Sequence, residues 1–167
     1  MPGNSSLTIR PARIEDSALI LDFICELADY EKLLDEVVAT VEDVETWVFG
    51  ERAYAEVLIA EWENKPAGFA LFFPNFSTFL ATPGIYLEDL YVRPGFRGLG
   101  IGRALLSELA KEVLQRGFKR LDWWVLRWNA TAINFYEDIG ARAMDDWVSY
   151  RLYGEALEAM AARGSTE

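Results

Sequence analysis

Three glycines at alternate positions, Gly98, Gly100 and Gly102, constrain the fold more than any other feature of the chain. They follow Ile85–Val92, an apolar stretch rich in β-branched and aromatic residues that is typical of a mostly buried strand. From Ile101 onward, apolar residues recur at three- and four-residue steps, which predicts an amphipathic helix. Because glycine adopts backbone conformations closed to other residues, the pattern predicts a strand, a tight turn and a helix in direct succession.

A glycine-rich turn at the start of a helix predicts an anion site. The first N–H groups of a helix lack intrahelical partners and lie at the positive end of its dipole. Arg97 and Arg103 add positive charge. A nucleoside-triphosphate loop would end in Lys followed by Ser or Thr, where this chain has Arg103 and Ala104. A dinucleotide site would place its first glycine directly after the strand, whereas Arg93–Arg97 intervene here. Both common nucleotide sites are therefore disfavoured.

Two adjacent acids, Glu88 and Asp89, interrupt the otherwise apolar strand. Burial and the neighbouring like charge would both raise the pKa of a carboxyl group there, which makes Glu88 a candidate general base. The two side chains are expected to point to opposite faces of the strand unless a bulge changes the alternation. The structural alternative is a pair of strand carboxylates satisfied by backbone groups or by arginine.

Composition narrows the classes of function. The chain has no histidine, which excludes histidine triads and histidine metal sites. Its 16 basic and 27 acidic residues give a formal net charge of −11. This charge disfavours binding to nucleic acid and favours cationic partners. The alternative is that the charge reflects only an acidic, solvated surface. No apolar run approaches the roughly 20 residues that span a bilayer. The single cysteine, Cys25, is predicted to be a core residue and suits a cytoplasmic location.

Length and patterning predict one domain over residues 1–167, with residues 1–6 flexible. Strands interleave with helices and no internal repeat is present. The patterns predict strands at 7–10, 54–62, 66–73, 85–92, 121–126 and 144–153, and helices at 14–30, 40–50, 100–115, 129–139 and 155–162, with 73–83 as a loop.

The turn Arg97–Gly102 resembles the R/Q-x-x-G-x-G/A signature of the GNAT superfamily of N-acetyltransferases. Other stretches, in the same order along the chain, resemble the spermidine/spermine and thialysine N-acetyltransferase group. They are Ile9–Ala12, Glu26–Ala28 with Tyr30–Glu31, Tyr86–Asp89, and Trp128–Asn129 with Ile133–Tyr136. The resemblance implies a GNAT fold of the α/β (α+β) class. Its central twisted sheet would be mixed and mostly antiparallel, with six to seven strands, about four flanking helices and acetyl-coenzyme A at the splayed strands.

The resemblance also implies the roles of individual residues. Glu88 would act as base, directly or through a water, and Tyr136 would donate a proton to the coenzyme A thiolate. The backbone N–H of Leu90 would stabilise the thioester oxygen, and Tyr91 and Val92 would pair with the pantetheine arm. The implied substrate-binding residues are Tyr30, Glu31, Glu88 and Asp89. The implied coenzyme A-binding residues are Leu90, Tyr91, Val92, Arg97, Gly98, Leu99, Gly100, Ile101, Gly102, Arg103, Asn129, Ala130, Thr131 and Ala132.

The resemblance implies direct acetyl transfer from acetyl-coenzyme A to a primary amine of a small cationic substrate, by a homodimer and without a metal. The charge and hydropathy of the chain predict that it binds neither nucleic acid nor a membrane. The acceptor is left open among polyamines, diamines and thialysine-like amino acids. The acid-rich stretch of the polyamine-acetylating relatives is replaced after Gly140–Ala141 by Met144–Val148. The alternatives are a protein lysine or N-terminal acetyltransferase and a non-catalytic acyl-coenzyme A sensor.

Overall fold

The structure is a computed structural model that describes residues 6–164. The expected flexible segment, residues 1–6, therefore lies almost entirely outside the described residues. The chain divides into two compact units, one ending at Trp124 and the other starting at Val125. The first contains β1 (Leu7–Pro11), α1 (Ser17–Tyr30), α2 (Val41–Phe49), β2 (Glu56–Trp62), β3 (Lys65–Ser77), β4 (Thr82–Val92), α3 (Ile101–Gln115) and β5 (Leu121–Trp123), with 3-10 turns at Ile14–Asp16, Leu34–Glu36 and Pro94–Phe96.

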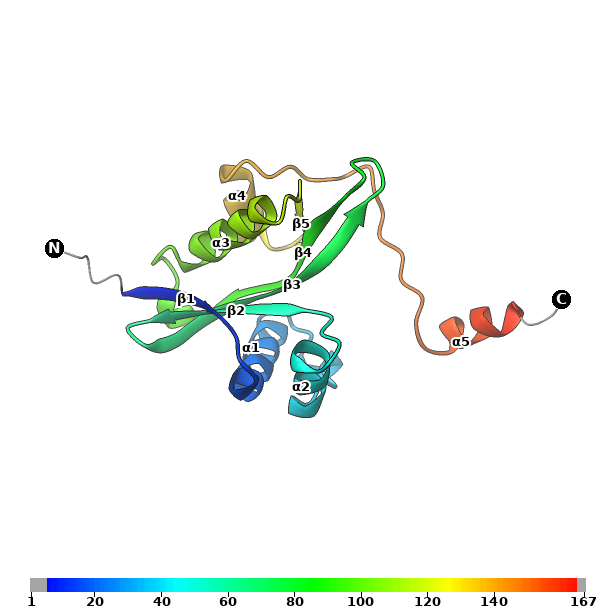
Figure 1. Cartoon of the computed structure of the whole chain (residues 1–167), viewed down its shortest axis with the longest axis horizontal. Coiled ribbons are helices and arrows are strands. Elements are labelled where there is room, and N and C mark those ends of the chain that lie inside the picture. Colours follow the sequence, from blue (N-terminus) through cyan, green and yellow to red (C-terminus); the bar gives the residue numbers. More distant parts are fainter. Residues whose placement is uncertain (1–5, 165–167) are drawn as a thin grey trace. The chain divides into compact units, whose positions relative to one another are not determined.

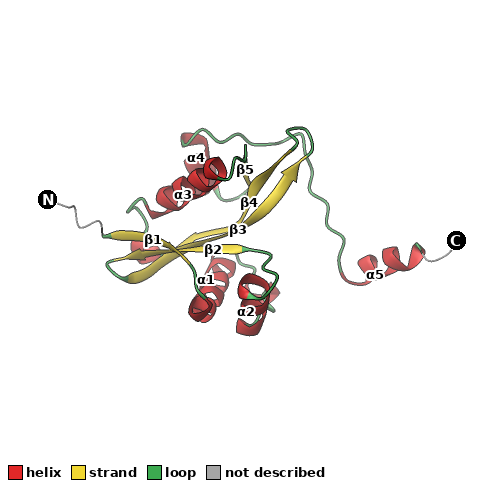
Figure 2. Cartoon of the chain, viewed as in Figure 1, coloured by secondary structure: helices red, strands yellow, loops and turns green. Residues whose placement is uncertain are grey.

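The five strands form one mixed sheet in the order β1-β2-β3-β4-β5 (Figure 2). The first four pair antiparallel, and β4 pairs parallel with β5. The expected GNAT-type mixed sheet is present, but its count of six to seven strands is wrong for residues 6–164, which hold five strands. These residues also hold five α-helices rather than about four.

Helices cover both faces of this sheet (Figure 1). On the face of α1 and α2, Ile20 and Phe23 are fully buried, and the Phe23 ring stacks on Phe69 of β3 at a centroid distance of 5.1 Å. On the opposite face, Leu105 and Leu109 of α3 are fully buried. Burying each such side chain stabilises the fold by about 1.5 to 3 kcal/mol. The core therefore fixes both α1 and α3 against β3 and β4.

The segment between β3 and β4 corrects a prediction. The stretch 73–83 was expected to be a loop because it contains two prolines, but β3 continues to Ser77 and β4 begins at Thr82. The β2 ladder ends at Phe72, so Pro74 pairs only with Ile85 of β4. A proline is tolerated at such an edge position because its missing N–H interrupts no second ladder.

The second unit contains α4 (Ala130–Asp138) and α5 (Gly154–Arg163). As predicted, Asn129 caps α4, and its Oδ1 accepts a hydrogen bond from the Ala132 N–H at 3.2 Å. The strand predicted over 144–153 is not found in the described chain, and the segment is a loop. High β-propensity alone does not make a strand, because the backbone groups also need a neighbouring strand to pair with. None of the described helices meets the length and apolarity needed to cross a membrane.

Candidate active site

The glycine turn leads into α3 as the sequence predicts. Gly98 and Gly100 both have φ of +79°, in the left-handed region that only glycine enters freely, and Gly100 is the N-cap of α3. A Cβ atom built on either residue would meet nothing within 4 Å. The backbone of the turn is therefore exposed, and a ligand can approach it beside the first N–H groups of α3. These features fit the diphosphate of coenzyme A.

Arg97 connects this turn to the end of α1. Its Nε donates a hydrogen bond to the Val92 carbonyl oxygen at 3.0 Å. Its guanidinium carbon lies 4.9 Å from the ring centre of Tyr30 and 5.8 Å from that of Tyr91. The contact joins a residue predicted to bind coenzyme A to one predicted to bind the amine. Sequence reasoning missed this pairing because the two residues are 67 positions apart, and no local pattern relates them.

A β-bulge lies at the two strand acids. Leu71 of β3 pairs with Asp89, but the next residue, Phe72, pairs with Leu87, so Glu88 is the extra residue of β4. Leu87 is buried on the α3 side, where the Phe72 ring lies 6.0 Å from the Arg116 guanidinium carbon. The sequence predicted that Glu88 and Asp89 would diverge unless a bulge intervened, and a bulge is present.

Beyond the bulge, Asp89 faces the α1 side of the sheet. Asp89 lies two residues before Tyr91 and therefore points to the same face of β4. Tyr91 packs in the core with α1. Burial, together with the charges of Glu88 and Glu31, raises the pKa of Asp89 from 3.8 to about 7. Burial also raises the pKa of Glu31, which caps the C-terminus of α1. The structure thus brings Glu31 and Glu88 close enough to Asp89 for their charges to act on it, while Glu88 itself is exposed.

One edge of β4 is open beside these acids. The β5 ladder covers only Ile85–Leu87, so within residues 6–164 no strand pairs with the following five residues of β4 on that side. Leu90, Tyr91 and Val92 lie in this part of the strand. Open backbone groups of this kind can accept an added extended chain. The geometry fits the predicted pairing with the pantetheine arm.

The other predicted site residues belong to the second unit. Asn129, Ala130, Thr131 and Ala132 form the cap and first turn of α4. Tyr136 lies in the same helix, partly buried, with its ring centre 5.5 Å from that of Phe135. Their functional roles remain predictions.

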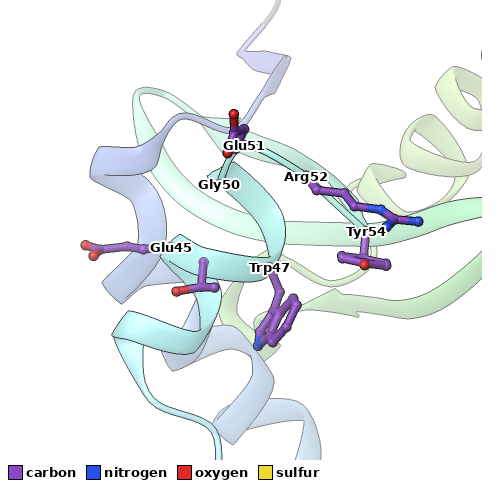
Figure 3. Close-up of a pocket in the computed structure, with 7 residues that line it drawn as sticks. Glu45, Trp47, Gly50, Glu51, Arg52 and Tyr54 are labelled. Carbon is purple, nitrogen blue, oxygen red and sulfur yellow. The ribbon is translucent and has the colours of Figure 1, made fainter.

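A surface pocket of about 490 Å³ lies at the C-terminal end of α2 (Figure 3). Its aromatic lining comes from Trp47 and Tyr54, whose ring centres are 5.5 Å apart. No residue predicted to act in catalysis or binding lines it. The part of the chain that the structure describes contains no group of three or more Cys, Asp or Glu residues arranged to hold a metal ion.

Comparisons with known proteins agree with this geometry. Residues 23–141 match the acetyltransferase (GNAT) family. A thialysine N-epsilon-acetyltransferase of Sus scrofa is 36% identical over 95% of this chain and 99% of its own length. An L-ornithine N5-acetyltransferase of Arabidopsis thaliana is 47% identical over 56% of this chain, but the match spans only 41% of that protein. An integron cassette protein from V. cholerae shares the fold with a TM-score of 0.78 and 30% identity, covering 93% of this chain and 98% of its own. The chain belongs to the GNAT family and is an N-acetyltransferase that uses acetyl-coenzyme A.

Proposed function

We propose that this enzyme acetylates a primary amine of a small molecule that carries more than one ionisable group, such as a thialysine-like amino acid, ornithine, a diamine or a polyamine. The observation that carries the proposal is that Asp89, beside the open edge of β4, is within reach of the charges of Glu31 and Glu88. Carboxylates attract an ammonium group. The names of the thialysine and ornithine acetyltransferases to which the chain is similar support the same class of acceptor.

The chemistry needs a proton acceptor at this place. An alkylamine has a pKa near ~10, by analogy with lysine, and is protonated at neutral pH, so it cannot attack a thioester until a proton is removed. A carboxylate of the Glu88–Asp89 pair takes that proton, and the sequence assigns the role to Glu88, directly or through a water. The Leu90 N–H stabilises the charge that develops on the thioester oxygen.

The remaining steps concern binding and the leaving group. The backbone N–H groups of the turn Arg97–Gly102 and of the first turn of α4 hold coenzyme A. The Tyr136 hydroxyl donates a proton to the departing thiolate. These assignments follow the family resemblance, and the open glycine turn and the Asn129 cap support them. No metal is needed for these steps.

We further propose that the two units act as one domain and that the enzyme is a cytoplasmic homodimer. The dimer proposal follows the family resemblance. Light scattering of the purified protein is expected to give twice the mass of 19.0 kDa, and a monomer would refute this assembly.

The function is tested by incubating the enzyme with acetyl-coenzyme A and a panel of thialysine, ornithine, diamines, polyamines and lysine-containing peptides. Thiol release is expected with at least one small amine. A preference for peptides would identify a protein acetyltransferase. Binding of acetyl-coenzyme A without turnover of any acceptor would identify a sensor, and either result would refute the proposed function.

A further inference from the structure

Phe23, Glu26 and Tyr30 lie on one face of α1, at spacings of three and four residues. This face contacts two arginines at the end of β4. Glu26 pairs with Arg93, whose guanidinium carbon lies 4.6 Å from the ring centre of Phe23, and Tyr30 contacts Arg97. The two arginines flank the 3-10 turn that precedes the glycines. One face of the helix therefore holds both ends of that turn.

The Arg93 side chain is fixed by contacts with α1 and β3. Its Nη2 donates a hydrogen bond to Glu26 Oε1 at 2.7 Å and its Nε donates one to Glu26 Oε2 at 3.0 Å, in the two-point geometry of an arginine–carboxylate pair. Its Nη1 donates to the Pro66 carbonyl oxygen at 3.1 Å. Its backbone N–H donates to the Ala67 carbonyl oxygen at 2.9 Å. Arg93 thus anchors the point at which the chain leaves the sheet.

The charges of the two arginines are used differently. Arg93 forms a partly buried ion pair with Glu26, with the side chains 27% and 34% exposed. Arg97 is exposed and takes part in no salt bridge within residues 6–164. The charge of Arg93 is therefore compensated inside the protein, whereas the charge of Arg97 is available to a diphosphate. Arg93 has the position of an anchor, not that of a phosphate ligand.

The glycine turn depends on its two ends for its position. Gly98 and Gly100 carry no side chain that could pack, and glycine loses more conformational entropy on ordering than any other residue. The far end of the turn is fixed by α3, whose Leu105 is fully buried. The near end is anchored by Arg93. A loop that is held in place before its ligand arrives binds more tightly, since less freedom is lost on binding.

We propose that Glu26 is a positioning residue for coenzyme A binding, which acts through Arg93 to hold the start of the glycine turn in place. The proposal rests on the proposed binding of coenzyme A by the turn Arg97–Gly102. In this role Glu26 needs no contact with coenzyme A or with the amine. The proposal also gives a function to the stretch Glu26–Ala28, to which the sequence assigned none.

The test is a double-mutant cycle on coenzyme A affinity, measured by calorimetric titration without an amine. Glu26→Ala removes a negative charge, whereas Arg93→Met removes a positive charge and keeps an apolar stem over Phe23. If the pair positions the turn, each variant should raise the Kd of coenzyme A by about 3- to 10-fold, and the double variant should raise it no more than either alone.

A long-range effect of charge predicts a different result. It would strengthen coenzyme A binding in Glu26→Ala and weaken it in Arg93→Met, because the two substitutions change the net charge in opposite directions. Effects of opposite sign would therefore overturn the proposal. Effects that multiply in the double variant would also overturn it, since the two residues would then act independently.

Glu56→Ala is the control for a merely structural role. Glu56 accepts two hydrogen bonds of 2.7 Å from Arg116, which lies at the end of α3 opposite the glycine turn. This variant should lower thermal stability without changing the Kd of coenzyme A. In turnover, Glu26→Ala should raise KM for acetyl-coenzyme A and leave kcat within about twofold of wild type. An unchanged Kd in Glu26→Ala, with a loss of stability like that of Glu56→Ala, would make Glu26 structural only.

Two further variants complete the test. Arg93→Lys keeps the positive charge but loses the two-point contact, so it should also weaken coenzyme A binding, and it replaces Glu26→Ala if that variant does not fold. Wild-type affinity in Arg93→Lys would overturn the proposal. Gly100→Ala separates this inference from the proposed function. Unchanged affinity in Gly100→Ala would refute the turn as the coenzyme A site, whereas a loss there without one in Glu26→Ala would refute the role of Glu26 alone.

Discussion

The guanidinium carbon of Arg97 lies 4.9 Å from the ring centre of Tyr30, and this contact joins the glycine turn to the end of α1. Stacking of a guanidinium on an aromatic ring contributes about 0.5 to 1 kcal/mol at an exposed site. The Nε hydrogen bond to the Val92 carbonyl holds the side chain in this position. Arg97 thus links α1 to the turn that is predicted to bind phosphate.

Replacing Arg97 by Lys is expected to weaken amine binding although the positive charge is kept. Lysine lacks the planar group that stacks on Tyr30 while hydrogen bonding to Val92. We expect KM for the amine to rise about 3- to 10-fold, the equivalent of about 1 kcal/mol, with kcat less affected. Arg103→Lys is the matched control, since it changes the same residue type one position beyond the signature. Equal effects of both variants on the amine KM would contradict a role of the Tyr30 contact.

Gly100→Ala is expected to impair both the turn and coenzyme A binding. Its φ of +79° costs an L-residue about 1 to 2 kcal/mol, and the added Cβ projects into the open space where the diphosphate would lie. Gly102→Ala is the control, because Gly102 is helical and its Cβ would make only an ordinary 4.0 Å contact with Val92. Thermal unfolding and calorimetric titration with coenzyme A measure the two effects. A loss of affinity in Gly102→Ala as large as in Gly100→Ala would contradict this account.

Asp89→Asn is expected to stabilise the protein at high pH. The folded-state pKa of Asp89 is about 7, above the unfolded value of 3.8, so the folded state binds the proton more tightly. Its ionisation therefore destabilises the fold as pH rises above about 4, and the cost levels off above about 7. Three pKa units correspond to about 4 kcal/mol, an upper limit for the gain in Asp89→Asn at pH 8. Chemical denaturation at pH 4 and pH 8 measures it, and a gain independent of pH would argue against the burial of this carboxyl.

Arg10→Gln is expected to destabilise the fold by about 1 to 3 kcal/mol. Arg10 donates two hydrogen bonds to Asp16, at 2.7 and 2.9 Å, and one to Glu61, at 3.0 Å, so it ties β1 to β2 and to the start of α1. The bond from Arg10 is the main cause that lowers the pKa of Asp16, so this stabilisation is present above pH 4 and is lost as pH falls below it.

Lys111→Gln is the control for this ion pair. Lys111 pairs with Glu108 on the exposed surface of α3, where such a pair contributes less than about 0.5 kcal/mol. Urea denaturation at pH 7 compares the two variants. If Lys111→Gln lowered the free energy of unfolding as much as Arg10→Gln does, burial of the Arg10 ion pair would add nothing to stability.

Tyr136→Phe is expected to lower kcat by about 10- to 1000-fold while leaving coenzyme A affinity unchanged, since it removes only the proton donor. Phe135→Leu is the control in the same helix, and it should alter stability more than kcat. Single-turnover kinetics separates the chemical step from product release. A Tyr136→Phe enzyme with wild-type kcat would exclude Tyr136 as the acid.

The local sequence was sufficient for the elements that depend on neighbouring residues. The helices expected at 40–50 and from Ile101 form as predicted, the first with a capping box of Thr40 and Asp43, because a cap or an amphipathic face is encoded within a few positions. The ordered motifs were sufficient to recognise the family, and the glycines were sufficient to predict a turn with left-handed backbone before α3.

Only the tertiary structure decided which strand acid is buried. The bulge at Glu88 depends on the register between β3 and β4, and the stacking of Arg97 on Tyr30 depends on the packing of α1 against the sheet. The same is true of the strand expected at 144–153, since a ladder needs a partner that no local pattern specifies. Spacing along one segment determines its periodicity and caps, whereas pairing between distant segments determines which side chains meet and how burial shifts their pKa.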